Sequence, residues 1–261
     1  MIRIKESELI LNPDGSIYHL NLKPEDISNT IFFVGDQDRV EKITKHFDTI
    51  EFSTQKREFK TQTGTYKGKR ISVISTGIGP DNIDIVLNEL DALINIDFTT
   101  RTIKEKLNSL NIIRIGTSGS LQSDIPVDSF LIGTHGLDLN GMLHFYELED
   151  ICNHEIENAF MKHTHWNSNK ARPIVINNSL ELERIFESKQ TYKGVTGTAG
   201  GFYGPQGRVL RLAIQDSELN NKMKGEYKCK DGDESCWVKQ SFIKNNYDRE
   251  LTEELSNYLK P

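Results

Sequence analysis

The sequence predicts an α/β fold in which helices cover both faces of a mixed or largely parallel β-sheet. Short runs of strand-forming residues recur along the chain, and several are apolar on both faces, as expected for strands buried between two layers. Helix-like patterns lie between these runs. The alternation of strand and helix favours one sheet with helices on each side, and in such folds ligands bind beyond the carboxyl ends of the strands.

Six strands are expected from their content of β-branched and aromatic residues: 30–34, 70–75, 111–115, 129–137, 172–177 and 192–200. Two helices are expected from apolar stripes. The first stripe contains Val40, Ile43 and Phe47, and the second contains Ile83, Val86, Leu87, Leu90 and Leu93. From residue 224 to 261 the chain is charged and lacks periodic apolar residues, so no element is predicted there.

The composition suits one large domain over residues 1–261, with 36% hydrophobic residues for its core. The net charge of -6 gives no general attraction to nucleic acid or anionic lipid, so an anion site requires clustered arginines. No apolar stretch reaches the ~18 residues that span a bilayer, and the start lacks a signal-peptide pattern, which predicts a cytoplasmic protein. The three cysteines predict free thiols, with a Cys229–Cys236 disulfide as the alternative.

The segment VGDQDRV at 34–40 joins the first expected strand to the first expected helix. Gly35 lets the backbone turn sharply and approach a bound group, and Arg39 follows in the first helical turn. A helix start offers free amides and a positive dipole end, so a guanidinium there makes a seat for phosphate. The alternative is an ordinary capped turn, with Asp36 or Asp38 as the cap and Arg39 in solvent.

The segment NIIRIGTSGSLQ at 111–122 places Arg114 inside an otherwise apolar strand. A buried arginine is costly unless an anion or an acid meets its charge. Thr117 and Ser118 follow directly, between two glycines, and offer hydroxyl and amide donors to phosphate or sugar oxygens. The alternative is that Arg114 pairs with a buried carboxylate.

The segment GFYGPQGR at 201–208 combines an aromatic ring, an amide and a cation in one glycine-rich loop. Phe202 offers a surface for stacking, Gln206 offers a donor and an acceptor together, and Arg208 can stabilise negative charge on a departing base. A planar heterocycle needs all three. The alternative is a plain surface turn, because glycine and proline are common in turns.

Seven segments in order over residues 18 to about 212 together resemble the nucleoside phosphorylase family, most closely its uridine phosphorylase branch. They are YHLNLKPEDI, VGDQDRVEKI, REF, STGIG, RIGTSGSLQ, GMLHFYELE and GFYGPQGR. The resemblance implies a three-layer sandwich with a central mixed sheet, and phosphorolysis of uridine to uracil and ribose 1-phosphate. It implies nucleoside and inorganic phosphate as small-molecule partners, and a homo-oligomer, either a dimer with shared active sites or a hexamer.

The resemblance also assigns roles to residues. It implies a phosphate site of Gly35, Arg39, Arg114 and Thr117, completed by Arg57 from a neighbouring subunit. It implies ribose contacts from His19, which crosses the subunit boundary, and Ser118, and base contacts from Phe202, Gln206 and Arg208, with Arg114, Gln206 and Arg208 acting in catalysis. No cofactor is implied beyond phosphate as co-substrate. Glu58 matches a residue that binds a monovalent cation such as K+ in some relatives, although Asn82 replaces the usual serine there and a salt bridge is the alternative.

One family feature is missing from the sequence. After the base loop, family members carry a Glu-Met-Glu type motif whose carboxylate grips the ribose hydroxyls, and no such motif is found after residue 212. A divergent tail, a loss of catalysis or a missing internal stretch would each explain this. The alternatives are therefore a phosphorylase-like protein that binds nucleoside or phosphate without turnover, or an enzyme with another base specificity. Arg39, Arg57 and Arg114 argue against a nucleosidase, which has no phosphate to hold.

Overall fold

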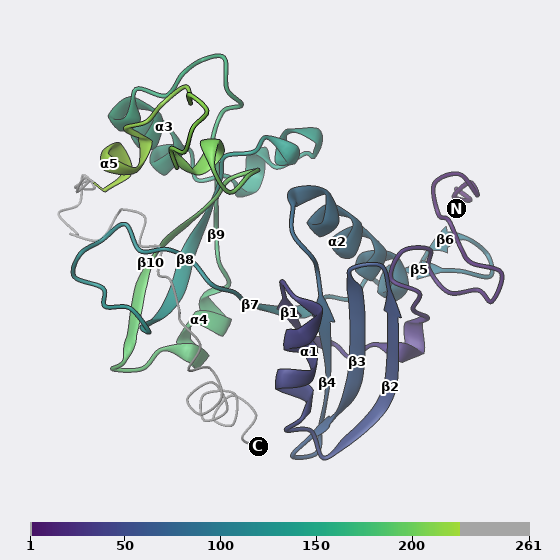
Figure 1. Ribbon diagram of the computed structural model, residues 1–261. Coiled ribbons are helices and arrows are strands. Elements are labelled where there is room, and N and C mark those ends of the chain that lie inside the picture. Colours follow the sequence, from purple (N-terminus) through teal and green to yellow (C-terminus); the bar gives the residue numbers. More distant parts are fainter. Residues whose placement is uncertain (1, 225–261) are drawn as a thin grey trace. The chain divides into compact units, whose positions relative to one another are not determined.

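The computed structural model describes residues 2–224, which form two compact units (Figure 1). The first unit comprises residues 2–116, and the described part of the second comprises residues 117–224. Almost all of the charged tail, from residue 225 onward, lies outside the described residues, as do Cys229 and Cys236. Cys152 is a free thiol, as expected.

The first unit is built on a mixed five-stranded sheet in the order β2-β3-β4-β1-β7. Its strands are β1 (Thr30–Val34), β2 (Thr49–Lys56), β3 (Phe59–Tyr66), β4 (Lys69–Ser75) and β7 (Asn111–Ile115). β1 runs parallel to β4 and β7, whereas β2, β3 and β4 are antiparallel neighbours. The mixed sheet expected from the sequence is confirmed, but the hairpin of β2 and β3 was not predicted.

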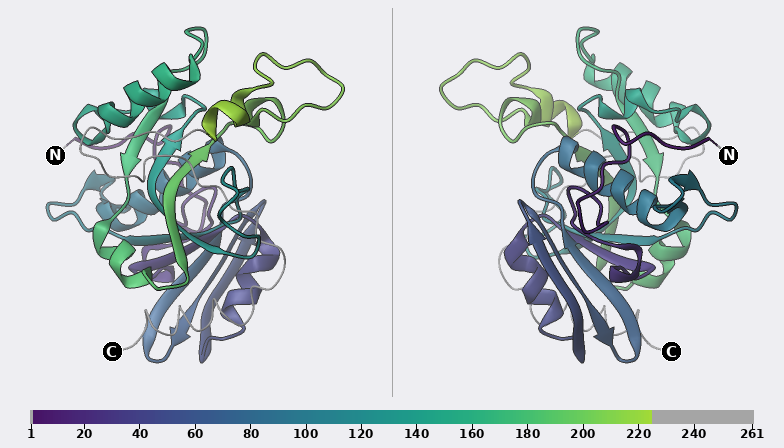
Figure 2. Two further views of the ribbon diagram at one scale, coloured as in Figure 1. Left: turned by 90° about the vertical axis from the view of Figure 1, so that its left-hand side faces the viewer. Right: turned by 90° about the vertical axis from the view of Figure 1, so that its right-hand side faces the viewer.

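Helices cover both faces of this sheet, which gives the unit three layers. The helices are α1 (Gln37–Thr44) and α2 (Pro80–Asn95). Phe32 and Val34 of β1 share a core cluster with Val40 and Ile43 of α1. The alternate residues of β1 pack with the α2 residues Val86, Leu90 and Leu93 in the other cluster. Figure 2 shows α1 lying along one face of the strands.

Both predicted helix stripes are largely correct. Phe47 lies just beyond the end of α1 and packs against its cluster. Leu87 is the exception, because it is 42% exposed on the outer face of α2. The remaining elements of this unit are short: η1 (Pro24–Asp26), β5 (Ile96–Asp97) and β6 (Thr102–Ile103).

The second unit has a mixed three-stranded sheet in the order β10-β8-β9. Its strands are β8 (Phe130–Asp138), β9 (Ile174–Asn177) and β10 (Thr191–Thr198). Its helices are α3 (His154–Thr164), α4 (Leu180–Phe186), α5 (Leu219–Met223), η2 (Met142–Phe145), η3 (Glu149–Ile151) and η4 (Gly204–Gln206). β8 pairs in parallel with β10 and antiparallel with β9. The three strands predicted in this region are confirmed.

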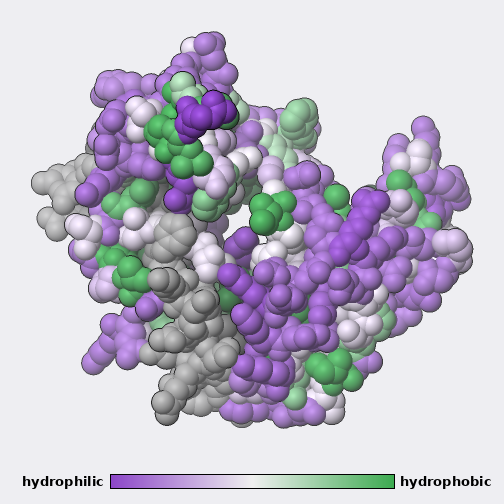
Figure 3. Space-filling view, in the orientation of Figure 1, coloured by the Kyte–Doolittle hydropathy of each residue, from purple (hydrophilic) through white to green (hydrophobic). Residues whose placement is uncertain are grey.

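The core of the second unit lies between its sheet and two of its helices. Leu137 and Val175 of the sheet pack with Phe160 of α3 and with Leu219 and Met223 of α5. Hydrophilic residues predominate on the face shown in Figure 3, and hydrophobic residues there lie in small separate groups. Within residues 2–224 no helix is both long and apolar enough to cross a bilayer.

Candidate active site

The ends of two neighbouring parallel strands carry the predicted oxyanion residues of the first unit. β1 and β7 pair in parallel, with Phe33 opposite Arg114, so the chain leaves both strands at the same edge of the sheet. Gly35 follows β1, and a side-chain carbon added there would meet no atom within 4 Å. The backbone of Gly35 therefore faces open space that a ligand can approach.

Helix α1 begins directly after Gly35. Asp36 is its N-cap, and the Asp36 side chain accepts a hydrogen bond from the backbone amide of Asp38 at 3.0 Å. Arg39 lies in the first turn and is half-buried. The capped turn and the anion seat, posed as alternatives from the sequence, are therefore compatible, because the cap occupies Asp36 and leaves the guanidinium of Arg39 at the helix start.

Arg114 lies close enough to Arg39 for their like charges to repel. Burial by the surrounding protein lowers the pKa of Arg114, and the positive charge of Arg39 lowers it further. Arg114 keeps exposed surface despite the surrounding protein, and the other residues of β7 are exposed or half-buried, which corrects the expectation of a buried strand. No carboxylate among the described residues pairs with Arg114, so the expected alternative of a buried ion pair is wrong for this part of the chain.

Gly116 is fitted to the Arg114 side chain. A side-chain carbon at position 116 would lie 2.1 Å from Nη1 of Arg114, well inside contact distance. The absence of a side chain at Gly116 therefore lets the guanidinium fold back over the chain that follows β7. The sequence indicated only free amides at the two glycines that flank Thr117 and Ser118, and this steric role of Gly116 was not predicted.

Arg57 lies in the two-residue turn between β2 and β3, next to Glu58. Its φ angle of 55° is left-handed, and its side chain is exposed. The backbone carbonyl of Arg57 accepts a hydrogen bond from Gln37 Nε2, and Gln37 Oε1 accepts one from Gln55 Nε2 at 3.0 Å. Gln37, the first residue of α1, thus ties the turn that carries Arg57 to the helix that carries Arg39.

Glu58 lies beside Gly77 and Asn82. A side-chain carbon added at Gly77 would lie 2.8 Å from Cγ of Glu58 and 2.7 Å from Nδ2 of Asn82. The salt bridge expected as one alternative for Glu58 is absent from the described residues. Residues 2–224 also contain no group of three or more histidine, cysteine or acidic side chains arranged to hold a metal ion, and the cation role of Glu58 stays a prediction.

His19 lies in the segment before β1 and pairs with Glu89, a residue that was not predicted to belong to the site. Its Nδ1 lies 2.7 Å from Oε1 of Glu89, on α2. The sequence did contain an indication of Glu89, because this acidic residue lies on the same helical stripe as the buried residues Val86, Leu90 and Leu93. The pairing partner itself, 70 residues away, could not be predicted from that stripe.

Thr117 and Ser118 begin the second unit. Thr117 is exposed and Ser118 is half-buried, and both lie in an irregular segment between β7 and β8. Their roles toward phosphate and ribose stay predictions.

The three residues predicted to recognise a base form one cluster in the second unit. The guanidinium carbon of Arg208 lies 4.5 Å from the centre of the Phe202 ring, in a cation–π arrangement. Arg208 Nε also donates a hydrogen bond to Gln206 Oε1 at 3.2 Å. Tyr203 packs edge-on against Phe202, with ring centres 5.1 Å apart. The loop therefore presents a ring, an amide and a cation together, as predicted.

A cavity of about 170 Å³ adjoins this cluster within the second unit. Gln206 and Arg208 form part of its wall, together with Ser120 and with Leu219 and Met223 of α5. The mixture of polar groups and apolar side chains suits a small heterocycle, which needs both hydrogen bonds and a nonpolar contact surface. The contribution of α5 to this wall was not expected from the sequence.

Comparisons with known proteins show the family of this chain. The family model described as the phosphorylase superfamily matches residues 29–229. A uridine phosphorylase from Haemophilus influenzae is 30% identical over 199 residues, which cover 74% of this chain and 66% of that protein. A DeoD-type purine nucleoside phosphorylase from Clostridium novyi is 34% identical over 134 residues, or 48% of this chain and 52% of that protein.

A solved structure of a Trypanosoma brucei nucleoside phosphorylase with uridine phosphorylase activity superposes with a TM-score of 0.78 at 26% identity, over 95% of this chain and 87% of that one. A uridine phosphorylase from Thermococcus kodakarensis is 34% identical over 128 residues, or 49% of this chain and 41% of that protein. The chain spans 41% to 66% of the length of the uridine phosphorylases from Thermococcus kodakarensis, Treponema pallidum and Haemophilus influenzae. With more than three quarters of its residues matched by the family model, the chain belongs to the phosphorylase superfamily.

Proposed function

We propose that this chain catalyses the phosphorolysis of a pyrimidine nucleoside, in which uridine and phosphate give uracil and ribose 1-phosphate. The observation that carries the proposal is the placement of Arg114 beside Arg39 with no carboxylate partner for Arg114 among the described residues. Two like charges held together favour a site that an oxyanion completes. The uridine phosphorylase relatives support the same reaction.

In the proposed reaction, an oxygen of phosphate forms a bond to the anomeric carbon of the ribose. The bond from that carbon to the base nitrogen breaks, and its electron pair leaves with the base. The proton of the phosphate dianion ends on the released uracil, so atoms and charge balance. The contribution of Arg39, Arg114 and the Gly35 amide is to hold and orient the nucleophile, with Thr117 and a partner subunit's Arg57 as further proposed contacts.

The proposed role of Arg208 is to stabilise negative charge that develops on the departing base. Gln206 offers a donor and an acceptor for the edge of uracil, and Phe202 offers a surface for its ring. The support for this assignment is the contact of Arg208 with both other side chains. His19 and Ser118 are the proposed ribose contacts, and Glu58 is a proposed site for K+ within a homo-oligomer that shares its active sites.

Two other functions are favoured by particular observations. The purine nucleoside phosphorylase from Clostridium novyi is as similar to this chain as some of the uridine phosphorylases, which favours a test of purine substrates. The chain also spans only part of the length of its curated relatives, so binding of a nucleoside without turnover should be tested as well. The Gln206 and Arg208 pair supports uracil over a purine.

A phosphate-dependent assay for base release tests the proposal. Purified protein is incubated with uridine, inosine or adenosine, with and without phosphate, and the free base is measured. The proposal expects uracil to form only when phosphate is present. Release of purine in preference to uracil would contradict the base specificity. A rise in melting temperature with uridine and no uracil release would show binding without catalysis.

A further inference from the structure

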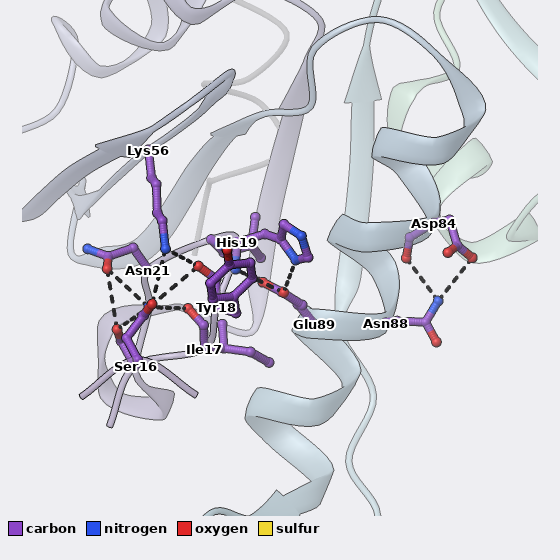
Figure 4. Close-up of polar contacts among 11 residues, drawn as sticks. Ser16, Ile17, Tyr18, His19, Asn21, Lys56, Asp84, Asn88 and Glu89 are labelled. Atoms are coloured by element: carbon purple, nitrogen blue, oxygen red, sulfur yellow. Dashed lines mark hydrogen bonds and ion pairs between the residues drawn. The ribbon is translucent and has the colours of Figure 1, made fainter. Parts of the chain in front are cut away.

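Glu89 accepts three different hydrogen-bond donors from the segment that carries His19 (Figure 4). The ring nitrogen Nδ1 of His19 lies 2.7 Å from Oε1. The backbone amide of His19 donates to Oε1 at 3.0 Å and to Oε2 at 3.1 Å, and the backbone amide of Leu20 donates to Oε2 at 2.8 Å. One carboxylate on α2 thus holds both the backbone and the ring at position 19.

This contact decides which ring nitrogen of a neutral His19 carries the proton. An ionised carboxylate only accepts hydrogen bonds, so Nδ1 must be the donor and Nε2 must keep its lone pair. No hydrogen bond of Nε2 to any described residue is formed. The His19 side chain is 26% exposed, whereas the Glu89 side chain is only 13% exposed, so the ring is reachable from solvent while its partner is largely covered.

The segment is held in place by other contacts as well as by those of Glu89. Lys56 Nζ donates to the carbonyl of Tyr18 and, at 3.1 Å, to Asn12 Oδ1. Asn21 Nδ2 donates to Thr54 Oγ1 at 3.2 Å. The flanking residues Ile17, Leu20 and Leu22 are buried. Several residues besides Glu89 therefore hold this segment, whereas among the described residues the hydrogen bond to the His19 ring comes from Glu89 alone.

We propose that Glu89 is a positioning residue that fixes His19 as the Nδ1–H tautomer and presents Nε2 as an acceptor to one sugar hydroxyl of the nucleoside. This inference rests on the proposed function. An acceptor requires a donor in the ligand, and the phosphate dianion carries a single proton, which the proposed reaction transfers to uracil. The base edge is assigned to Gln206 and Arg208. The sugar hydroxyls are the donors that remain.

The tautomer can be read directly by ¹⁵N NMR of the full chain with labelled histidine, at about pH 8.5, above the ordinary histidine pKa of about 6.5. The wild-type protein is expected to show His19 as the Nδ1–H form. In Glu89→Gln the amide oxygen can still accept from the Leu20 amide, which turns the amide NH2 toward Nδ1. His19 is then expected to switch to the Nε2–H form.

Asp84→Asn provides the matched control, because Asp84 lies on the same helix and bonds to Asn88 instead (Figure 4). It is expected to leave the His19 signal unchanged. A wild-type spectrum with His19 as the Nε2–H form would overturn the proposal without any variant. An unchanged tautomer in a folded Glu89→Gln protein would overturn it as well.

Kinetics with deoxy analogues test the link to the sugar. Glu89→Gln is expected to lower kcat/KM for uridine by about two- to tenfold, the range for one neutral hydrogen bond, and Asp84→Asn is expected to have no effect. Among 2′-, 3′- and 5′-deoxyuridine, the analogue without the contacted hydroxyl should be used equally well by the wild type and Glu89→Gln. An equal loss for uridine and all three analogues would overturn the sugar contact.

Absence of wild-type turnover would refute the proposed function and the sugar contact with it, whereas the tautomer result would stand on its own.

Discussion

Glu157 in the second unit and Arg114 in the first are both charged side chains set among neighbouring elements, but their surroundings differ. Glu157 on α3 is 1% exposed, and it accepts hydrogen bonds from the Val175 amide at 3.0 Å, from His154 Nδ1 at 2.8 Å and from Arg172 Nη2 at 3.0 Å. Arg114 has no such partner among the described residues, and the like charge of Arg39 acts on it.

The pKa shifts express this difference. Burial alone raises the pKa of Glu157, but the Val175 amide, His154 and Arg172 outweigh it and the pKa is lowered, so the folded protein favours its charge. Burial and the like charge of Arg39 both lower the pKa of Arg114, so both disfavour its charged form. The charge of Glu157 is neutralised within the chain and stabilises the fold, whereas the charge of Arg114 is the one that we propose a bound anion neutralises.

Arg114→Ala tests whether the charge of Arg114 binds the proposed anion, and of the variants compared here it should have the largest effect. Each charge-assisted contact contributes about 1.5–3 kcal/mol, so kcat/KM for uridine phosphorolysis should fall on the order of ten- to a hundredfold or more. The melting temperature should not fall, because a repulsive contact is removed. Arg184→Ala, at an exposed position on α4, is the matched control. Turnover by Arg114→Ala at the wild-type rate would refute the assignment.

Gly116→Ala should weaken the same site without removing a charge. The new methyl group would lie 2.1 Å from Nη1 of Arg114, so the guanidinium must move. We expect roughly tenfold weaker phosphate binding, about 1.4 kcal/mol, measured by calorimetry. Gly136→Ala is a suitable control, since a side-chain carbon there meets no atom within 4 Å. Phosphate affinity that is the same in both variants would show that the position of Arg114 does not matter.

Glu157→Gln tests whether the charge of Glu157 stabilises the fold. The substitution keeps the shape of the side chain but removes the charge that His154 and Arg172 meet, so the free energy of unfolding should fall by about 1–3 kcal/mol in urea titrations. Phosphate affinity should be unchanged, in contrast to Arg114→Ala. A stability loss in Arg114→Ala larger than that in Glu157→Gln would reverse the comparison.

The difference in unfolding free energy between the wild type and Glu157→Gln should depend on pH. This effect is smaller, and its direction follows from the pKa of Glu157. The folded pKa of Glu157 is lowered from the ordinary 4.5, so its contribution is complete above about pH 4.5 and is lost as the pH falls through the folded value. The gap in unfolding free energy between the wild type and Glu157→Gln should therefore be constant near neutrality and close in acid. A gap that widens on acidification would show that Glu157 is not stabilised as an anion.

Much of the fold could be predicted from apolar periodicity, and its failures have a physical cause. β1 and β7 were predicted at their observed bounds, because both are short runs rich in β-branched or aromatic residues. β2 and β3 were missed because their sequences are dominated by threonine, glutamine and lysine. Thr61 and Thr63 of β3 are fully buried, so polar β-branched residues fill positions where a search for apolar residues finds nothing.

The parts of the candidate site that depend on the direction of the strands could be predicted from the sequence. The parts that depend on side-chain contacts between residues far apart in the sequence could not. The approach of Arg39 and Arg114 follows from parallel strands that end at one edge, which sequence alternation already implied. The contact of Glu89 with His19 joins a helix to an irregular segment, and no periodicity links them. The steric need for Gly116 depends on the rotamer of Arg114, which residue types alone do not determine.

The central claim is that Arg39 and Arg114 bind one and the same oxyanion, and calorimetric titration with phosphate tests it most directly. The wild type, Arg39→Ala, Arg114→Ala and the double variant should be compared at one salt concentration. We expect each single variant to bind phosphate at least tenfold more weakly, and the two losses in binding free energy to be non-additive in the double variant, as for two groups on one ligand. Wild-type phosphate affinity in Arg114→Ala, or losses that simply add, would contradict the account.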